Sequence, residues 1–157
     1  MATNMRGLIE YHGIDDCAYE NLPYFNQINT DFTFCVPTQK PDIEQITKVW
    51  AKPCIVQKKI VKTPKGVSLE GQNITGYKLM VVGDIQYKVE YVANEATQSL
   101  HTAHTTIPFC GYIVLPEKFN VNSILTTSII LEDIYSEQVD IRCIYNNVTM
   151  MLVTDLC

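Results

Sequence analysis

The sequence predicts an all-β fold, a β-sandwich of about eight strands with one short helix and an extended N-terminal arm. Two observations carry this prediction. In residues 83–93, apolar side chains alternate with polar ones, which is the period of two expected for a strand with one solvated face. From Cys54 onward, β-branched stretches of strand length alternate with short turn-forming segments, a spacing typical of β-sandwiches.

The chain divides into an arm and one folded domain. Residues 1–30 show no periodicity, although they contain several aromatic residues, and we expect them to form an extended arm. A single domain is expected over residues 31–157. Its first strand is expected at residues 32–36, because this β-rich segment ends at Pro37.

Residues 41–50 carry a helical pattern. Apolar side chains fall three and four residues apart along this stretch, at Ile43, Ile46, Val49 and Trp50. Pro41 suits the first position of a helix, and the acidic residues that follow it favour the N-terminal end of the helix dipole. We therefore expect one short helix over about 41–50.

The remaining apolar segments are expected to be strands. They are rich in β-branched and aromatic residues, and the segments between them contain Gly, Pro, Asn or Ser, which favour turns. The expected strands lie at residues 54–63, 67–69, 74–92, 99–109, 111–115, 124–135 and 139–153.

Charge and hydropathy exclude several classes of protein. The chain has 157 residues, with 12 Lys and Arg against 17 Asp and Glu, so its net charge is −5. A surface that follows nucleic-acid phosphates needs clustered basic residues, and the densest lysine segment, residues 58–65, is instead interleaved with Val and Ile. The chain shows no apolar run of membrane-spanning length and no signal peptide. We expect no nucleic-acid partner and no membrane insertion.

The sequence offers no motif for catalysis or for binding a cofactor. Its glycines form no phosphate-binding loop. His101 and His104 lie three residues apart on an expected strand, so their side chains point to opposite faces and cannot chelate one metal ion. A nucleophilic Cys110 with His104 as its base would need an electropositive setting, whereas Cys110 lies in an apolar stretch. We expect no catalytic residues, no cofactor and no metal site.

Three stretches of the sequence, taken in their order along the chain, resemble those of a known family. They are residues 34–46 (FCVPTQKPDIEQI), residues 83–93 (GDIQYKVEYVA) and residues 106–115 (TIPFCGYIVL). In order and spacing, from about residue 28 to residue 153, they resemble the SPOCS domain, the SipL-like domain of spore-forming Firmicutes. The chain resembles a solitary SPOCS domain without the LysM module that accompanies it in SipL.

The resemblance implies a structural role at the surface of the endospore. It implies assembly rather than catalysis, and synthesis in the mother-cell cytosol without a signal peptide. We expect a protein that assembles with copies of itself, and with other spore coat proteins, in a coat layer, an exosporium lattice or an appendage fibre. The arm would add to the sheet edge of a neighbour by β-augmentation. Its contact candidates are aromatic: Tyr11, Tyr19, Tyr24 and Phe25.

Six cysteines fit such an assembly. Disulfide cross-links between subunits would lock a surface that must outlast its cell, and the candidates are Cys17 in the arm and Cys157 at the last position. The other four lie within expected strands, so we expect them to be buried or bonded within the chain; they are Cys35, Cys54, Cys110 and Cys143. The sequence assigns no pairing among them.

Two other functions stay open at the level of the sequence. The first is a spore coat morphogenesis adaptor that binds one coat protein and does not polymerise. The second is an enzyme or a carbohydrate-binding module, which would require a cleft that gathers Tyr, Asp and Glu side chains.

Overall fold

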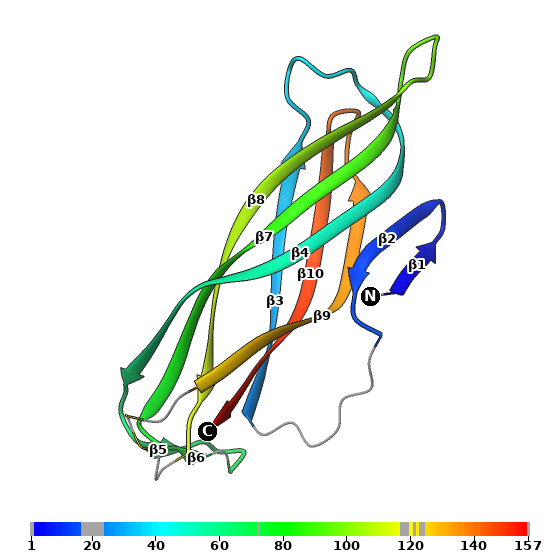
Figure 1. The fold of residues 1–157 in the computed structure, drawn as a ribbon. Helices are drawn as coiled ribbons and strands as arrows, with labels where there is room; N and C mark the ends of the chain where they lie inside the picture. Colours follow the sequence, from blue (N-terminus) through cyan, green and yellow to red (C-terminus); the bar gives the residue numbers. More distant parts are fainter. Residues whose placement is uncertain are drawn as a thin grey trace.

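Ten β-strands make up most of the chain in the computed structural model, which describes residues 2–16, 24–71, 73–116, 120, 122 and 125–156 (Figure 1). The strands are β1 (Ala2–Arg6), β2 (Ile9–Ile14), β3 (Tyr24–Cys35), β4 (Ile43–Lys62), β5 (Gly66–Val67), β6 (Asn73–Ile74), β7 (Tyr77–Ala93), β8 (Leu100–Val114), β9 (Leu125–Gln138) and β10 (Cys143–Leu156). The described residues contain no helix. The all-β prediction is therefore confirmed.

Two of the sheets pack face to face, as Figure 1 shows. The larger sheet has the strand order β1-β2-β4-β7-β8, and the smaller sheet has the order β3-β10-β9. Strands β5 and β6 form a separate pair in the connection between β4 and β7. Every pairing is antiparallel except that of β2 with β4, which is parallel and covers three residue pairs. This arrangement confirms the expected β-sandwich.

The hydrophobic core fills the space between the two sheets. In β7 every second side chain from Leu79 to Ala93 is buried or replaced by a buried glycine, so the strand alternates as the sequence predicted. The smaller sheet contributes fully buried side chains of its own, among them Ile134, Ile144 and Val148. The core therefore combines side chains from both sheets, and the sandwich depends on packing between strands that are far apart in the sequence.

The expected helix over 41–50 is wrong, because β4 begins at Ile43 and runs through this stretch. Two register shifts against β7, at residues 43–45 and 46–48, explain the misleading pattern. A bulge adds one residue to a strand, so that side chains three residues apart point to the same face. Three side chains with this spacing are buried in the core, namely Ile43, Ile46 and Val49. A strand with two bulges therefore imitates the apolar spacing of a helix.

Residues 1–30, which we expected to be an arm, contain the β1–β2 hairpin and the first part of β3. The hairpin lies at one edge of the larger sheet, and Gly13 allows the close approach of β2 to β4. Gly13 has a φ of +110°, and a Cβ atom there would lie 2.2 Å from the carbonyl oxygen of Ala51. A side chain at this position would push β2 away from β4.

The same hairpin also contacts the smaller sheet. Arg6 forms an ion pair with Asp133 of β9 at 2.8 Å, and its guanidinium lies 4.5 Å from the centre of the Tyr11 ring. The Asp15 carboxylate accepts a hydrogen bond from the Leu131 amide at 2.8 Å. The β1–β2 hairpin therefore bridges the two sheets of its own chain.

The aromatic contact candidates of the arm have different surroundings. Tyr11 is 2% exposed and lies in the core of its own chain, because alternate residues of β2 face the smaller sheet. Tyr24 is half-buried and packs against the core, whereas Phe25 is 52% exposed. Tyr19 lies outside the described residues. Phe25 is thus the described candidate that is open to a neighbour.

A small polar cluster is buried between the sheets. The Tyr11 hydroxyl accepts a hydrogen bond from the Ser136 amide at 3.0 Å and donates one to the Ser136 carbonyl at 3.3 Å. Ser136 Oγ and Asn146 Oδ1 lie 2.6 Å apart in a further hydrogen bond. The Tyr87 hydroxyl faces this cluster, but within the described part of the chain it makes no hydrogen bond of normal geometry. Burial raises the pKa of Tyr87 well above its usual value.

Two tyrosine substitutions compare the effect on stability of the hydrogen-bonded Tyr11 hydroxyl with that of the Tyr87 hydroxyl, which has no partner of normal geometry. We expect Tyr11→Phe to lower the free energy of unfolding by about 1–3 kcal/mol, because it leaves buried backbone groups of Ser136 without their partner. We expect Tyr87→Phe to be neutral or stabilising by up to about 1 kcal/mol, because it removes a buried hydroxyl that has no good partner. Urea unfolding followed by the fluorescence of Trp50, the one tryptophan in the chain, measures both. Equal losses in the two variants would contradict this account.

Candidate functional site

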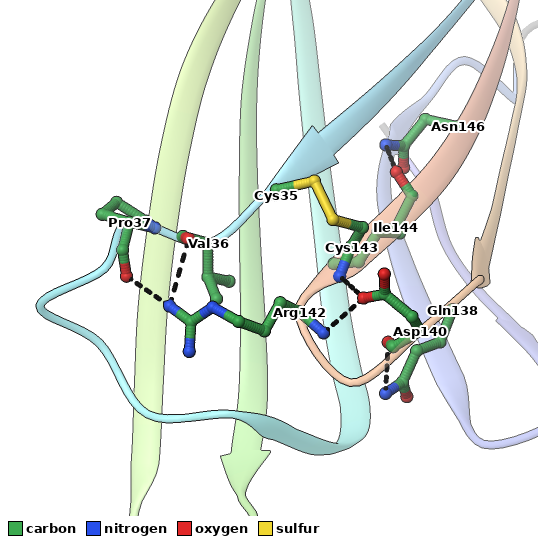
Figure 2. The surroundings of a disulfide bond; sticks show 9 residues. All are labelled: Cys35, Val36, Pro37, Gln138, Asp140, Arg142, Cys143, Ile144 and Asn146. Carbon is green, nitrogen blue, oxygen red and sulfur yellow. Dashed lines mark hydrogen bonds between the residues drawn. A yellow bond between two sulfur atoms is a disulfide. The ribbon is translucent and has the colours of Figure 1, made fainter.

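Cys35 and Cys143 form a disulfide bond across the smaller sheet (Figure 2). Cys35 ends β3, Cys143 begins β10, and the two residues lie directly opposite each other in the register of these strands. Because 108 positions separate them in the sequence, the bond closes a loop that contains most of the chain. They are two of the four cysteines that we expected to be buried or bonded within the chain.

Next to this disulfide, Arg142 forms hydrogen bonds to the segment that connects the two sheets (Figure 2). The connection, residues 36–42, leaves β3 in the smaller sheet and enters β4 in the larger one. Arg142 Nη1 donates a hydrogen bond to the Asp42 carboxylate at 2.6 Å, within an ion pair. Arg142 Nη2 donates to three backbone carbonyls of the connection, those of Val36 (3.3 Å), Pro37 (2.7 Å) and Lys40 (3.1 Å). A planar guanidinium with five donors suits this task.

The turn between β9 and β10, which carries Arg142, is held by hydrogen bonds of its own. The Asp140 carboxylate accepts hydrogen bonds from the amides of Arg142 at 2.6 Å and Cys143 at 2.7 Å. The Gln138 side chain donates to the carbonyls of Asp140 at 3.0 Å and Ile43 at 3.1 Å. We call the disulfide together with Asp42, Asp140 and Arg142 the clasp, because it joins the ends of three strands.

The other cysteines differ in exposure. Cys54 on β4 is half-buried and has a free thiol. Cys110 is also free but exposed, so the expectation that it is buried or bonded within the chain is wrong. Side chains alternate along β8, and Phe109 on one side of Cys110 points into the core while Cys110 points to solvent. Cys17 and Cys157 lie outside the described residues.

The sheets offer several strand edges to a neighbour. Edge strands expose backbone groups that pair readily with another chain. Along β8 this edge is interrupted by Pro108, which has no N–H to donate, and by Asn26 of β3, whose side chain donates to the Tyr112 carbonyl at 2.7 Å. The edge of β4 is open over a long stretch. Strand β2 pairs only with residues 48–50, so residues 51–62 have no partner strand on that side within the described part of the chain. Pro53, which also lacks an N–H, lies near the start of this stretch, and residues 54–62 follow it without a further proline.

A cleft of about 910 Å³ lies on the outer face of the larger sheet. Four side chains cross it in one row, from His12 on β2 through Trp50 and Lys88 to His104 on β8. His12 stacks on Trp50 with ring centres 5.2 Å apart, and Lys88 Nζ lies 4.7 Å from the centre of the indole. Among the described residues, those that line the cleft include no Asp or Glu, and one carboxylate, that of Glu10, lies 2.9 Å from His12 Nε2.

The two histidines considered for metal binding lie on different faces of β8, as the sequence predicted. His101 stacks on Tyr91 with ring centres 5.9 Å apart, whereas His104 is exposed on the outer face. Within the described residues, no three His, Cys, Asp or Glu side chains come together as metal ligands. The same part of the chain has no helix of the length and apolarity that crossing a membrane requires.

Part of the chain matches a known protein family. The family model described as SipL, SPOCS domain matches residues 42–142, well over half of the chain. The matched segment begins at Asp42 and ends at Arg142, the two partners of the ion pair in the clasp. No curated protein and no solved structure matches the chain.

The clasp predicts a large effect on stability when the disulfide is removed. We expect the double variant Cys35→Ser, Cys143→Ser to lose about 2–4 kcal/mol of unfolding free energy, because the bond closes a long loop. Arg142→Lys keeps the charge but cannot serve four acceptors, and we expect it to cost about 1–3 kcal/mol. Urea unfolding measures both, with Cys54→Ser, Cys110→Ser as the matched control. Wild-type stability in the Cys35, Cys143 variant would contradict the role of the clasp.

The exposure of the thiols predicts their order of reaction. During a short pulse of maleimide on the folded protein, we expect Cys110 to be alkylated faster than Cys54, because Cys54 is half-buried. Peptide mass spectrometry measures the extent of labelling at each position. Cys35 and Cys143 should be labelled only after reduction. Equal rates at Cys54 and Cys110 would show that β8 does not present Cys110 to solvent.

Proposed function

Because the chain belongs to the SPOCS domain family, we propose that it is a structural protein of the bacterial endospore surface that assembles with copies of itself. The assembly would be a coat layer, an exosporium lattice or an appendage fibre. The family match over residues 42–142 carries the connection to the spore. The protein would be made in the mother-cell cytosol and reach the spore surface from there.

The unpaired edge of β4 supports assembly by strand addition. Residues 51–62 are long enough to take a full-length strand from a neighbour, and backbone hydrogen bonds would supply the affinity. Val56 within this edge is 67% exposed, and Phe25 on the edge strand β3 is also open to solvent. The neighbour would contribute one of its own edge strands, because the β1–β2 hairpin of the arm is paired within its own chain.

Disulfide cross-links between subunits would then make the assembly permanent. Cys17 and Cys157 are the proposed cross-linking residues, and the exposed thiol of Cys110 is a third candidate. Two thiols lose two electrons and two protons to an oxidant such as oxygen when they form a disulfide. This step fits a protein that is made in a reducing cytosol and is exposed to oxidant after the mother cell lyses.

The second candidate function is an adaptor that binds another spore coat protein and does not polymerise. The cleft on the outer face of the larger sheet favours it, because a concave surface with a Trp, two His and Lys side chains is suited to a protein partner. The two functions differ in whether the purified chain associates with itself.

Electron microscopy of the purified protein tests the proposed function. We expect filaments or sheets, and light scattering that rises with protein concentration. After oxidation, non-reducing gels should show a ladder that shortens in the variants Cys17→Ser and Cys157→Ser. A stable monomer at high concentration would contradict self-assembly and favour the adaptor. Assemblies that run only as monomers on non-reducing gels would contradict the cross-links alone.

A further inference from the structure

Exposed charges of opposite sign are separated at the two ends of the molecule. We call one group the lysine end; its members are all exposed, and they are Lys58, Lys59, Lys62 and Lys65. We call the other group the carboxylate end; its members are also all exposed, and they are Glu44, Glu95, Glu137 and Asp140. A chain with a net charge of −5 thus carries a local cluster of positive charge.

The topology places these groups at opposite ends of the long strand β4. Glu44 is the second residue of β4 and Lys62 is its last. The turns that carry the other carboxylates lie beside the start of β4, because Ile43 pairs with Ala93 and its amide donates to the Ile141 carbonyl at 2.7 Å. In Figure 1 these turns lie at the top, and the end of β4 lies at the bottom beside β5 and β6.

The two groups are too far apart to neutralise each other within one chain. Eighteen residue steps of β4 span roughly 60 Å, at about 3.3 Å per residue. The Debye length at physiological salt is only about 8 Å. Each end therefore presents its own charge to solvent.

Local partners do not neutralise the two ends either. Among the described residues, the four lysines form no ion pair, and Lys58 donates to a backbone carbonyl, that of Leu125, at 3.0 Å. Glu44 accepts a hydrogen bond from Gln98 at 2.8 Å, and Glu137 accepts one from Tyr135 at 3.0 Å; both donors are neutral. Glu95 lies 3.5 Å from His101 Nε2, and Asp140 accepts hydrogen bonds from two backbone amides of the clasp. In the same part of the chain, no Lys or Arg side chain pairs with the carboxylate end.

We propose that the lysine end of one copy docks against the carboxylate end of the next copy, so that the chains join head to tail. This inference rests on the proposed function and names the contact. Four positive and four negative side chains make the two ends complementary. A polyanion would be repelled by the remaining charge of an acidic chain, whereas a second copy brings a matching acidic surface.

The position of the lysine end links this contact to strand pairing. Three of its lysines lie within the unpaired edge of β4, residues 51–62, or at its end. A copy attracted to these lysines arrives beside backbone groups that have no partner strand. Because the contact joins two different surfaces, its repetition produces a filament unless the rotation between successive copies closes a ring.

Charge reversal tests the proposal. The lysine-end variant is Lys59→Glu, Lys62→Glu, and the carboxylate-end variant is Glu44→Lys, Glu137→Lys. These residues are exposed and bond at most to an exposed or half-exposed neighbour. The matched control, Thr33→Glu, Thr102→Glu, changes the net charge as much as the single variant Lys59→Glu, which is made beside it, and lies at exposed positions of β3 and β8 outside both ends. Association is followed by light scattering and electron microscopy at about 20 mM and about 1 M salt.

We expect the wild-type rate of association to fall by about tenfold or more in high salt. Each end variant alone should associate about tenfold more slowly than wild type, and the control should resemble wild type. An equimolar mixture of the two end variants should recover association into pairs, because each altered end has no net charge, whereas one variant keeps the intact carboxylate end and the other keeps the intact lysine end. This recovery also shows that both variants are folded.

Other results would overturn the proposal. If the wild type assembles equally well at both salt concentrations, or if the mixture does not recover, the head-to-tail contact is wrong although self-assembly stands. A wild-type chain that stays monomeric at both salt concentrations contradicts the proposed function and this contact together.

Discussion

The position at which β4 begins is set by the clasp, and the larger sheet depends on that position. The disulfide holds the end of β3 against the start of β10, and Arg142 holds the connection that leads from β3 to β4. Without Arg142, carbonyls at residues 36, 37 and 40 would lose the donor that satisfies them. Strands β2 and β7 both pair with β4, so a shift of its start would move both of these registers.

β4 serves two purposes along its length. Its first half is bulged and buried, and it belongs to the sandwich, whereas most residues from Val56 to Lys62 are exposed. The change occurs at a further register shift between Ile55 and Gln57, opposite Gly83 of β7. A Cβ atom at Gly83 would lie 2.1 Å from the Cys54 carbonyl oxygen, so only glycine lets the two strands approach this closely. The sandwich thus continues into a ribbon that is open on one edge.

The sequence predicted those features of the fold that depend only on residues close together in the chain. The alternation in β7 and the all-β class follow from the pleat of a strand, which is written in successive residues. Successive residues do not reveal bulges. The spacing of Ile43, Ile46 and Val49 predicts a helix, and only the pairing of β4 with β7 shows why a strand has this spacing. The outward direction of Cys110 likewise follows from the register of β8 with β7.

Contacts between distant segments account for the rest of what the sequence missed. The clasp pairs residues about a hundred positions apart, and the row from His12 to His104 crosses four strands. The cysteines of the disulfide are visible in the sequence, but their pairing depends on β3 and β10 being neighbours. The lysines of the lysine end are visible in the sequence as a segment interleaved with Val and Ile, but their separation from the carboxylate end depends on how the strands are arranged.

The lysine end also explains how an open strand edge can exist without indiscriminate pairing. Lysines along an edge disfavour the approach of another strand, because the incoming backbone must displace their hydration and two such edges repel each other. Two β4 edges brought together would place like charges side by side. A neighbour that brings carboxylates removes this repulsion in one orientation only. The three lysines on the edge would therefore disfavour the symmetric pairing of two β4 edges, and the lysine end as a whole would favour the proposed head-to-tail contact.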